Sequence, residues 1–394
     1  MTEKNNQYYN ELDQKHYLPT FKRYPITLVR GQGSQVWDAD GKEYIDALGG
    51  IAVNALGHNH PALVEAISKQ AGKLIHISNF YLSEPQVELS QKITSLAQIE
   101  RVFFSNSGAE SVEGAIKIAR KYAHSIGRGG EVISFEGSFH GRTLATIATG
   151  KKQMQHGFEP IPAGFKQVPL NNMDALRKVV SKETAAIIVE PIQGEGGINV
   201  VPDSFLKELR SFCDKQDIVL IFDEIQCGIA RTGKMFAHEH VGIKPDIMTL
   251  AKGLGGGMPV GAILSNEKVS SAIDFGDHGT TFGGNPLATA AALAVLKTIE
   301  QEQLTQAAHE KGEWIKEQIM TMKHPDIKEV RGRGLMIGIE FRFETKPLVQ
   351  KMLENGVLAN ATAGNVLRLV PPLIISYKEL ERVIEVMEKS IKEL

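Results

Sequence analysis

The stretch Asp246-Ile-Met-Thr-Leu-Ala-Lys252-Gly-Leu-Gly-Gly-Gly-Met-Pro259 joins an apolar run to a lysine and a group of glycines. The run Ile247–Ala251 predicts a buried strand, and in open α/β sheets ligands bind at the carboxyl edge, where this lysine is expected. The glycines let the backbone approach a bound molecule closely. A partly desolvated lysine is a nucleophilic amine that can form a Schiff base. An isolated Lys-Gly pair is more often a surface turn, so this interpretation depends on the rest of the chain.

Composition excludes several classes of protein. The chain has 394 residues, 42% hydrophobic and 23% charged, which is ordinary for a globular protein. A net charge of -2 gives no reason to expect nucleic acid or an anionic membrane as a partner. Cys213 and Cys227 are the only cysteines, which favours a reducing compartment over a disulfide framework. The polar N-terminus and the lack of a long apolar run predict no signal peptide and no membrane span, so we expect a cytoplasmic protein.

Short apolar runs alternate with helical patterns from about residue 85 onward. This alternation is typical of an α/β fold, with a mostly parallel sheet covered by helices on both faces. Strands are predicted at 102–104, 131–135, 184–190, 218–222, 247–251 and 262–265. We predict an N-terminal arm and part of a small α+β domain at 1–55, a large domain at 56–300, and the C-terminal part of the small domain at 301–394.

Two segments suggest sites that we do not favour. The segment Gly228–Lys234 has the spacing of a P-loop, which would indicate a nucleotide-binding ATPase. However, Met235 stands where that motif needs a hydroxyl, and the loop follows an acidic strand instead of preceding it. His58 and His60 could be imagined as metal ligands, but no cysteine or acidic cluster accompanies them. We therefore predict a turn there and no metal site.

Asp223 ends the predicted strand Ile218–Phe222, and Lys252 ends a strand roughly 30 residues later, the length of one strand–crossover–strand unit. Both side chains can therefore face one crevice at the carboxyl edge of the sheet. A buried carboxylate needs a cationic partner, and a pyridinium nitrogen would serve. A lysine Schiff base together with an aspartate on a pyridine nitrogen is the arrangement that pyridoxal phosphate requires.

A phosphate group also needs a binding site, and the cofactor ring needs a cover. The segment Phe104–Glu110 runs from a strand into a helix, with Ser107, Gly108 and Ala109 at the helix start, where free N–H groups bind anions. The loop after the strand Glu131–Phe135 supplies Phe139 as an aromatic face. An ordinary helix cap and a core phenylalanine are the alternatives for these two features.

These motifs resemble those of class III (subgroup II) aminotransferases of fold type I, over about residues 20–380. The resemblance rests on Phe222–Gln226, on Leu250–Gly253 and on His278–Pro286. Within the class the chain is most similar to the acetylornithine aminotransferases. The resemblance implies a pyridoxal 5'-phosphate enzyme with a large domain containing the sheet and a small domain built from both ends of the chain. It also implies a homodimer with shared active sites.

The resemblance also assigns roles to particular residues. It implies that Lys252 carries the cofactor and shuttles a proton, and that Asp223 holds the pyridine nitrogen. The other implied cofactor contacts are Gln226 near the ring hydroxyl, Phe139 on the ring, Ser107, Gly108 and Ala109 at the phosphate, and Thr281 at the phosphate of the neighbouring subunit. The implied substrate contacts are Arg142, Thr280, Glu195 and Arg368.

Glu195 and Arg368 match a glutamate–arginine pair of the family. In the family, this pair lets the amino donor and 2-oxoglutarate bind in turn at one site. The resemblance implies that Glu195 masks Arg368 while an ω-amino donor is bound. Glu195 then moves away, so that Arg368 can bind the carboxylate of 2-oxoglutarate. From the sequence alone, Arg368 could equally be a surface charge.

The donor is the more open part of the prediction. Ornithine aminotransferases usually carry a tyrosine where this chain has Gly49–Asn54, which argues against free ornithine. The segment Ser111–Glu113 instead resembles that of 4-aminobutyrate aminotransferases. We expect transfer of the δ-amino group of N2-acetylornithine to 2-oxoglutarate, a step of arginine biosynthesis. Succinylornithine, ornithine and 4-aminobutyrate remain alternative donors, and a catalytically silent protein that binds pyridoxal phosphate remains an alternative of another class.

Overall fold

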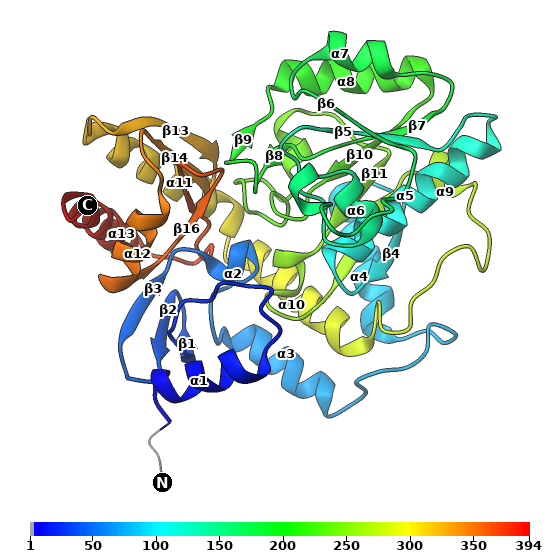
Figure 1. Ribbon diagram of the computed structural model, residues 1–394. Coiled ribbons are helices and arrows are strands. Elements are labelled where there is room, and N and C mark those ends of the chain that lie inside the picture. Colours follow the sequence, from blue (N-terminus) through cyan, green and yellow to red (C-terminus); the bar gives the residue numbers. More distant parts are fainter. Residues whose placement is uncertain (1–3) are drawn as a thin grey trace.

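The computed structural model describes residues 4–394, so the first three residues of the predicted N-terminal arm lie outside the described residues. Figure 1 shows the large sheet with its helices on one side of the molecule and, on the other, the blue elements from early in the chain beside the orange and red ones from its later part. Among residues 4–394, no helix has the length and apolar character needed to cross a membrane.

A seven-stranded sheet forms the centre of the large domain. Its order is β4 (Arg101–Ser105), β12 (Gly261–Ser265), β11 (Ile247–Leu250), β10 (Val219–Asp223), β7 (Thr184–Val189), β5 (Glu131–Phe135) and β6 (Phe165–Val168). Only β12 runs antiparallel to its neighbours, so the predicted α/β fold with a mostly parallel sheet is confirmed. The edge strand β6 was not predicted, because its residues are mostly half-buried and its pattern is less apolar.

Strand β7 shows why these sequences are apolar without alternation. Successive side chains of a strand point to opposite faces of the sheet. Ile187 and Val189 pack against α8 (Asp203–Gln216), whereas Ala186 and Ile188 pack against α5 (Gly108–Ser125). Because both faces are covered, both sets of side chains are buried.

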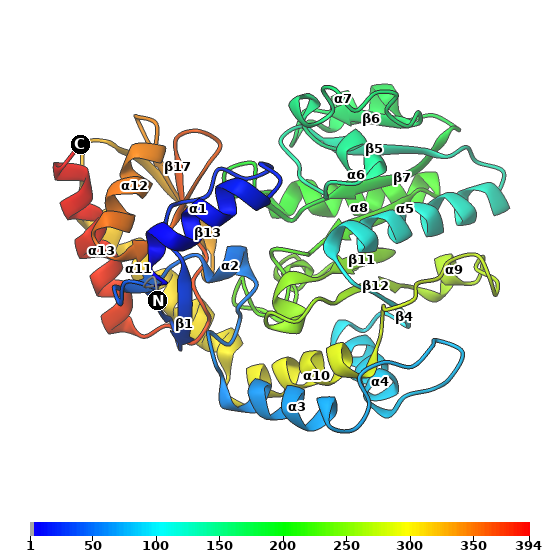
Figure 2. The same cartoon turned by 60° about the horizontal axis from the view of Figure 1, so that its bottom comes forward.

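The remaining helices of the large domain surround this sheet. Helix α3 (Pro61–Ala71) lies against α10 (Pro286–Gln301), as Figure 2 shows. The others are α4 (Glu84–Ala97), α6 (Leu144–Ala148), α7 (Met173–Val179) and α9 (Glu267–Ser270), with 3-10 turns at Lys152–Met154, Ala237–His240 and Lys252–Gly255. A short two-stranded sheet, β8 (Ile192–Gln193) with β9 (Asn199–Val200), follows β7.

Segments from both ends of the chain form the small domain. One sheet has the order β1 (Leu28–Gln32), β2 (Gln35–Asp38), β3 (Glu43–Asp46) and β15 (Val357–Leu358). The other has the order β13 (Ile327–Arg333), β14 (Met336–Phe341), β17 (Val366–Leu369) and β16 (Asn360–Thr362). Around them lie α1 (Asn6–His16), α2 (Gly49–Ala52), α11 (Leu304–Thr321), α12 (Lys346–Glu354) and α13 (Tyr377–Lys392). The parallel pairing of β3 with β15 joins the two ends, while the exact domain boundaries stay a prediction.

The segment Gly228–Lys234 belongs to the large domain and forms hydrogen bonds with the small domain. Within it, the fully buried guanidinium of Arg231 donates to the carbonyl oxygens of Leu335 (3.0 Å) and Pro371 (2.5 Å) in the small domain. Burial lowers the pKa of Arg231 to about 9. The N–H groups of Gly228, Ala230 and Gly233 donate to carbonyl oxygens of the same loop region. Since these amides are already bonded, the geometry argues against a phosphate-binding P-loop.

The two histidines considered as metal ligands have separate partners. His58 Nε2 lies 2.8 Å from Asp46 Oδ2, and His60 Nε2 lies 3.3 Å from a carboxylate oxygen of Glu302. Within residues 4–394, no three His, Cys, Asp or Glu side chains come together as metal ligands would.

Gly312 in α11 provides a test of the contact between this helix and the β13–β14 turn. A Cβ atom at Gly312 would lie 2.1 Å from the carbonyl oxygen of Gly334, which is backbone and has little freedom to move. We expect Gly312→Ala to lower stability by about 1–3 kcal/mol through overpacking, although alanine is the better helix former. Thermal unfolding followed by circular dichroism measures this.

Gly72→Ala is the matched control, because a Cβ atom there would meet nothing closer than 3.6 Å. The control is expected to change stability by no more than about 0.5 kcal/mol. Equal stability of the two variants would contradict the close approach at Gly312.

Candidate active site

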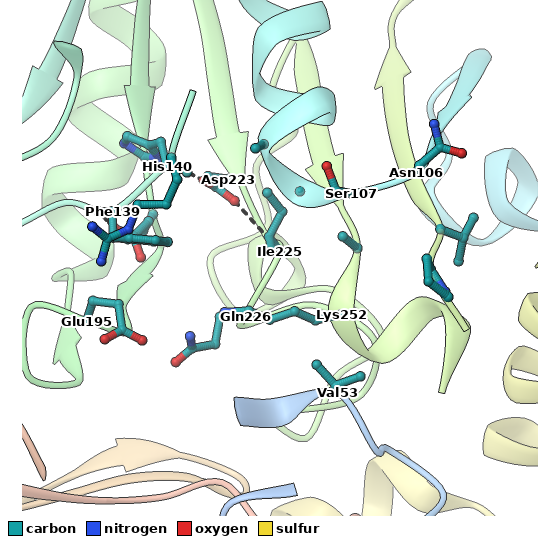
Figure 3. A pocket seen from close by; sticks show the side chains of 18 of the residues that line it. Val53, Asn106, Ser107, Phe139, His140, Glu195, Asp223, Ile225, Gln226 and Lys252 are labelled. Atoms are coloured by element: carbon teal, nitrogen blue, oxygen red, sulfur yellow. Dashed lines mark hydrogen bonds and ion pairs between the residues drawn. The ribbon is translucent and has the colours of Figure 1, made fainter. Parts of the chain in front are cut away.

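A cavity of about 430 Å³ opens at the carboxyl edge of the large sheet. Its size lies within the range of small-molecule sites. In Figure 3, Phe139 and His140 lie on one side of it, and Ser107 and Asn106 lie on the other. Its lining residues include Val53, Asn106, Ser107, Gly108, Ala109, Phe139, His140, Arg142, Glu190, Glu195, Asp223, Ile225, Gln226 and Lys252.

Neighbouring strands bring the predicted acid and amine into this cavity. Strands β10 and β11 run parallel, with Asp223 opposite Thr249, and Lys252 follows three residues after Thr249. The backbone of Lys252 has φ of +42°, in the left-handed region that residues other than glycine seldom occupy. Strain of this kind is often found at functional sites, where the surrounding structure maintains it.

The amine of Lys252 is buried. Burial, together with the positive charge of Arg368, lowers the pKa of Lys252 below its ordinary value, although Glu195 and Asp223 act in the opposite direction. A larger fraction of neutral amine makes this side chain a better nucleophile.

Three donors hold the buried carboxylate of Asp223. His140 Nδ1 lies 2.7 Å from Oδ2, while the Ile225 amide (3.0 Å) and Thr249 Oγ1 (3.3 Å) donate to Oδ1. Burial would lower the pKa of His140, but the hydrogen bond and charge of Asp223 outweigh it, and the pKa is raised. His140 was missed in the sequence. Its place beside Phe139, in the loop after β5, was the available signal.

Glu190 is a second acid that sequence reasoning missed. It lies at the end of β7, is buried, and accepts hydrogen bonds from the amides of Phe139 (2.9 Å) and Gly194 (3.1 Å). Burial raises its pKa to about 7. The carboxyl group therefore connects the loop that carries Phe139 to the loop that carries Glu195.

The start of α5 could hold an anion. Ser107 is the N-cap and accepts from the Glu110 amide at 3.3 Å, and Gly108 and Ala109 begin the first turn. The first amides of a helix have no acceptor within it and point outward, so they favour a negative group. The opposite wall carries half-buried Phe139, with the guanidinium of Arg142 5.4 Å from its ring centroid.

The structure brings Glu195 and Arg368 together, as predicted. Arg368 is fully buried, so it is not the surface charge that the sequence allowed. Its Nη1 donates to Glu195 Oε1 (2.5 Å) and to Gln226 Oε1 (3.2 Å). Burial would raise the pKa of Glu195, but the charge of Arg368 reverses this and the pKa is lowered. The pair is therefore an ion pair at neutral pH.

The two threonines of the segment after α9 lie outside the lining of this chain's own cavity. Thr280 Oγ1 lies 3.2 Å from Nδ2 of Asn106, which does line the cavity. Thr281 is exposed to solvent. The predicted contact of Thr281 with a neighbouring subunit stays a prediction.

Sequence and structure comparisons identify the family. The family "Aminotransferase class-III" matches residues 18–391. The acetylornithine aminotransferase of Methanocaldococcus jannaschii is 51% identical over 389 residues, which are 98% of both chains.

Solved structures agree with this. A crystal structure of acetylornithine aminotransferase from Elizabethkingia anophelis superposes with a TM-score of 0.88 at 38% identity, covering 99% of this chain and 100% of the other. An ornithine aminotransferase from Toxoplasma gondii superposes with a TM-score of 0.95 at 32% identity, covering 100% and 95%. Its structure was reported with partial occupancy of pyridoxal phosphate at the active site. The chain described here therefore belongs to the class III aminotransferases.

Proposed function

We propose that this aminotransferase uses pyridoxal 5'-phosphate to transfer the δ-amino group of N2-acetylornithine to 2-oxoglutarate. The observation that carries the proposal is the placement of Asp223 and Lys252 at the ends of adjacent parallel strands in one cavity. The relatives support the choice of donor, since those at 51% and 49% identity are both named acetylornithine aminotransferase.

The residues of the cavity fit the cofactor. Asp223 supplies a buried carboxylate for the pyridine nitrogen, and the start of α5 at Ser107, Gly108 and Ala109 supplies amides for the phosphate. Phe139 offers an aromatic face on one side. The hydrogen-bonded carboxyl group of Asp223 suits a cationic partner, because a buried carboxylate without one would be strongly destabilised.

When bound, pyridoxal phosphate supplies an electron sink for the carbon that loses its proton. Lys252 would have two tasks in turn, since its amine would hold the cofactor before the donor binds and, once released, would carry a proton from the substrate carbon. Its lowered pKa suits the second task, because a neutral amine can accept that proton. Gln226 lines the cavity, accepts a hydrogen bond from Arg368 Nη1 at 3.2 Å, and would contact the ring hydroxyl.

The cationic side chains of the cavity would select the substrates. Arg142 lines the cavity, is exposed, and would bind the α-carboxylate of the donor. Thr280 lies beside Asn106, outside the lining, and would lie near the substrate. Glu195 neutralises Arg368 while a donor without a second carboxylate is bound. Movement of the Glu195 side chain would free Arg368 for 2-oxoglutarate.

Two features of the structure bear on the donor. The tyrosine of ornithine aminotransferases falls at Gly50, where φ is +64° and a Cβ would lie 3.2 Å from Asn54 Nδ2, so a side chain at this position would be strained. Val53 is the residue of the segment that lines the cavity. In contrast, the Ser111 hydroxyl donates to the carbonyl oxygen of Leu250, and Ser111 does not line the cavity. The serine that replaces the alanine of acetylornithine enzymes here therefore affects packing and does not contact the substrate.

A donor panel tests the assignment. At saturating 2-oxoglutarate we expect N2-acetylornithine to give the highest kcat/KM, about tenfold or more above 4-aminobutyrate, a difference of about 1.4 kcal/mol in transition-state binding. The physical reason is that 4-aminobutyrate has one carbon fewer between its amine and its carboxylate, so it would not reach Arg142 and the reacting end of the cavity together as N2-acetylornithine would. The panel also includes N2-succinylornithine and ornithine, with glutamate formation as the readout.

A higher value for 4-aminobutyrate would overturn the donor and leave the aminotransferase activity in place. An enzyme whose absorbance responds to no amino donor would instead indicate the catalytically silent alternative.

We also infer a homodimer with shared active sites. Large apolar residues are exposed near Thr281, among them Phe282, with 60% of its surface exposed, and Phe80, with 93% exposed. Phenylalanines exposed to this extent are unusual on the surface of a monomer. A second copy packed on this surface would bury them. It would also carry Thr281 toward the phosphate site of its partner.

Mixed dimers of Lys252→Ala and Thr281→Ala subunits test the sharing. Each parent is expected to be inactive at limiting pyridoxal phosphate, because one lacks the amine and the other loses a hydrogen bond to the phosphate. If Thr281 acts across the interface, random mixing restores about a quarter of wild-type activity, since one site of each mixed dimer is intact. Thr321→Ala, at an exposed threonine, is the control and should retain full activity. Absence of any recovery in verified mixed dimers would show that Thr281 does not act in the partner's site.

A further inference from the structure

Strand β16 contacts both members of the Glu195–Arg368 pair. In the antiparallel pairing of β16 with β17, Asn360 lies opposite Arg368, and Thr362 follows two residues later on the same face. Asn360 Oδ1 accepts a hydrogen bond from Arg368 Nε at 2.9 Å. Thr362 Oγ1 donates to the main-chain carbonyl oxygen of Glu195 at 2.8 Å.

Arg368 needs partners that remain when Glu195 leaves. Its guanidinium is fully buried, and a buried charge that loses its partners is strongly destabilised. Glu195 and Gln226 both contact Nη1, whereas Asn360 contacts Nε on another edge of the guanidinium. Asn360 can therefore keep the guanidinium in one orientation while a substrate carboxylate replaces Glu195.

Hydrogen bonds hold the main chain of Glu195 in place, whereas its side chain has space to rotate. The carbonyl oxygen accepts from Thr362 and also from Lys151 Nζ at 3.4 Å. The side chain is 31% exposed, which leaves it room to rotate. The glycine before it serves close packing, since a Cβ at Gly194 would lie 2.2 Å from Gln226 Oε1.

We propose that β16 positions the Glu195–Arg368 pair, which we call the gate, and that Asn360 and Thr362 are its positioning residues. Asn360 holds Arg368 ready for the second carboxylate of the acceptor. Thr362 anchors the main chain of Glu195, so that the gate opens by rotation of one side chain and closes again onto Arg368. The proposal rests on the proposed function, which requires Glu195 to mask Arg368 in one half-reaction and release it in the other.

The test separates binding of a dicarboxylate from reaction with the donor. Glutarate, which has no keto group and cannot react, reports on Arg368 by calorimetric titration of the cofactor-loaded enzyme. Single-turnover absorbance reports on the donor half-reaction with N2-acetylornithine. Asn360→Ala is expected to raise the Kd of glutarate about tenfold, the effect of losing one hydrogen bond to a charged group, and to leave the donor half-reaction within about twofold of wild type.

Thr362→Val should show the opposite pattern, because a freed main chain weakens the closed pair. We expect the donor half-reaction to slow by about threefold or more, with no increase in the Kd of glutarate. Asn365→Ala is the matched control, since Asn365 lies in the same hairpin and contacts Glu340 and Phe341 instead of the gate. It should resemble wild type in both measurements.

Two outcomes would overturn the proposal. One is a Kd of glutarate in Asn360→Ala equal to that of wild type. The other is an equal loss in both measurements for both variants, which a general structural role would produce. If wild-type enzyme itself transfers no amino group to 2-oxoglutarate, the proposed function fails, and this is visible before any variant is made.

Discussion

The structure depends on one constraint, which is that two buried groups of opposite character end adjacent parallel strands. Asp223 closes β10, and Lys252 follows β11, so the register of two strands sets both positions. Neither group is stable alone in a buried site, because a carboxylate and an amine both lose hydration there. Each is therefore supported by neighbours, Asp223 by His140 and Thr249, and Lys252 by the negative charge of Glu195 and Asp223.

Every other part of the site enters from the same edge of the sheet or from the small domain. Phe139 follows β5, the start of α5 follows β4, and Glu190 directly follows β7. Arg368 comes instead from β17 of the small domain, so it reaches Glu195 and Gln226 only when the two domains are held together. Arg231 contributes to this by donating to the carbonyl oxygen of Pro371, close in sequence to Arg368.

The sequence predicted those features that follow from regular patterns. Apolar runs predicted the central strands, and residues at their carboxyl ends predicted the acid and the amine. His140 and Glu190 were missed, since a polar residue that bonds a neighbouring loop leaves no periodic signal. Asn360 was missed for the same reason, because its role follows from the cross-strand register that places it opposite Arg368. The contribution proposed for Thr281 would require a second copy of the chain.

The measurement that tests the account most directly is the location of the cofactor. Purified protein is saturated with pyridoxal phosphate, reduced with borohydride and digested, and the peptides are analysed by mass spectrometry. The account predicts a phosphopyridoxyl adduct on Lys252. No adduct, or an adduct confined to other lysines, would contradict the role of Lys252 and with it the assignment of the site.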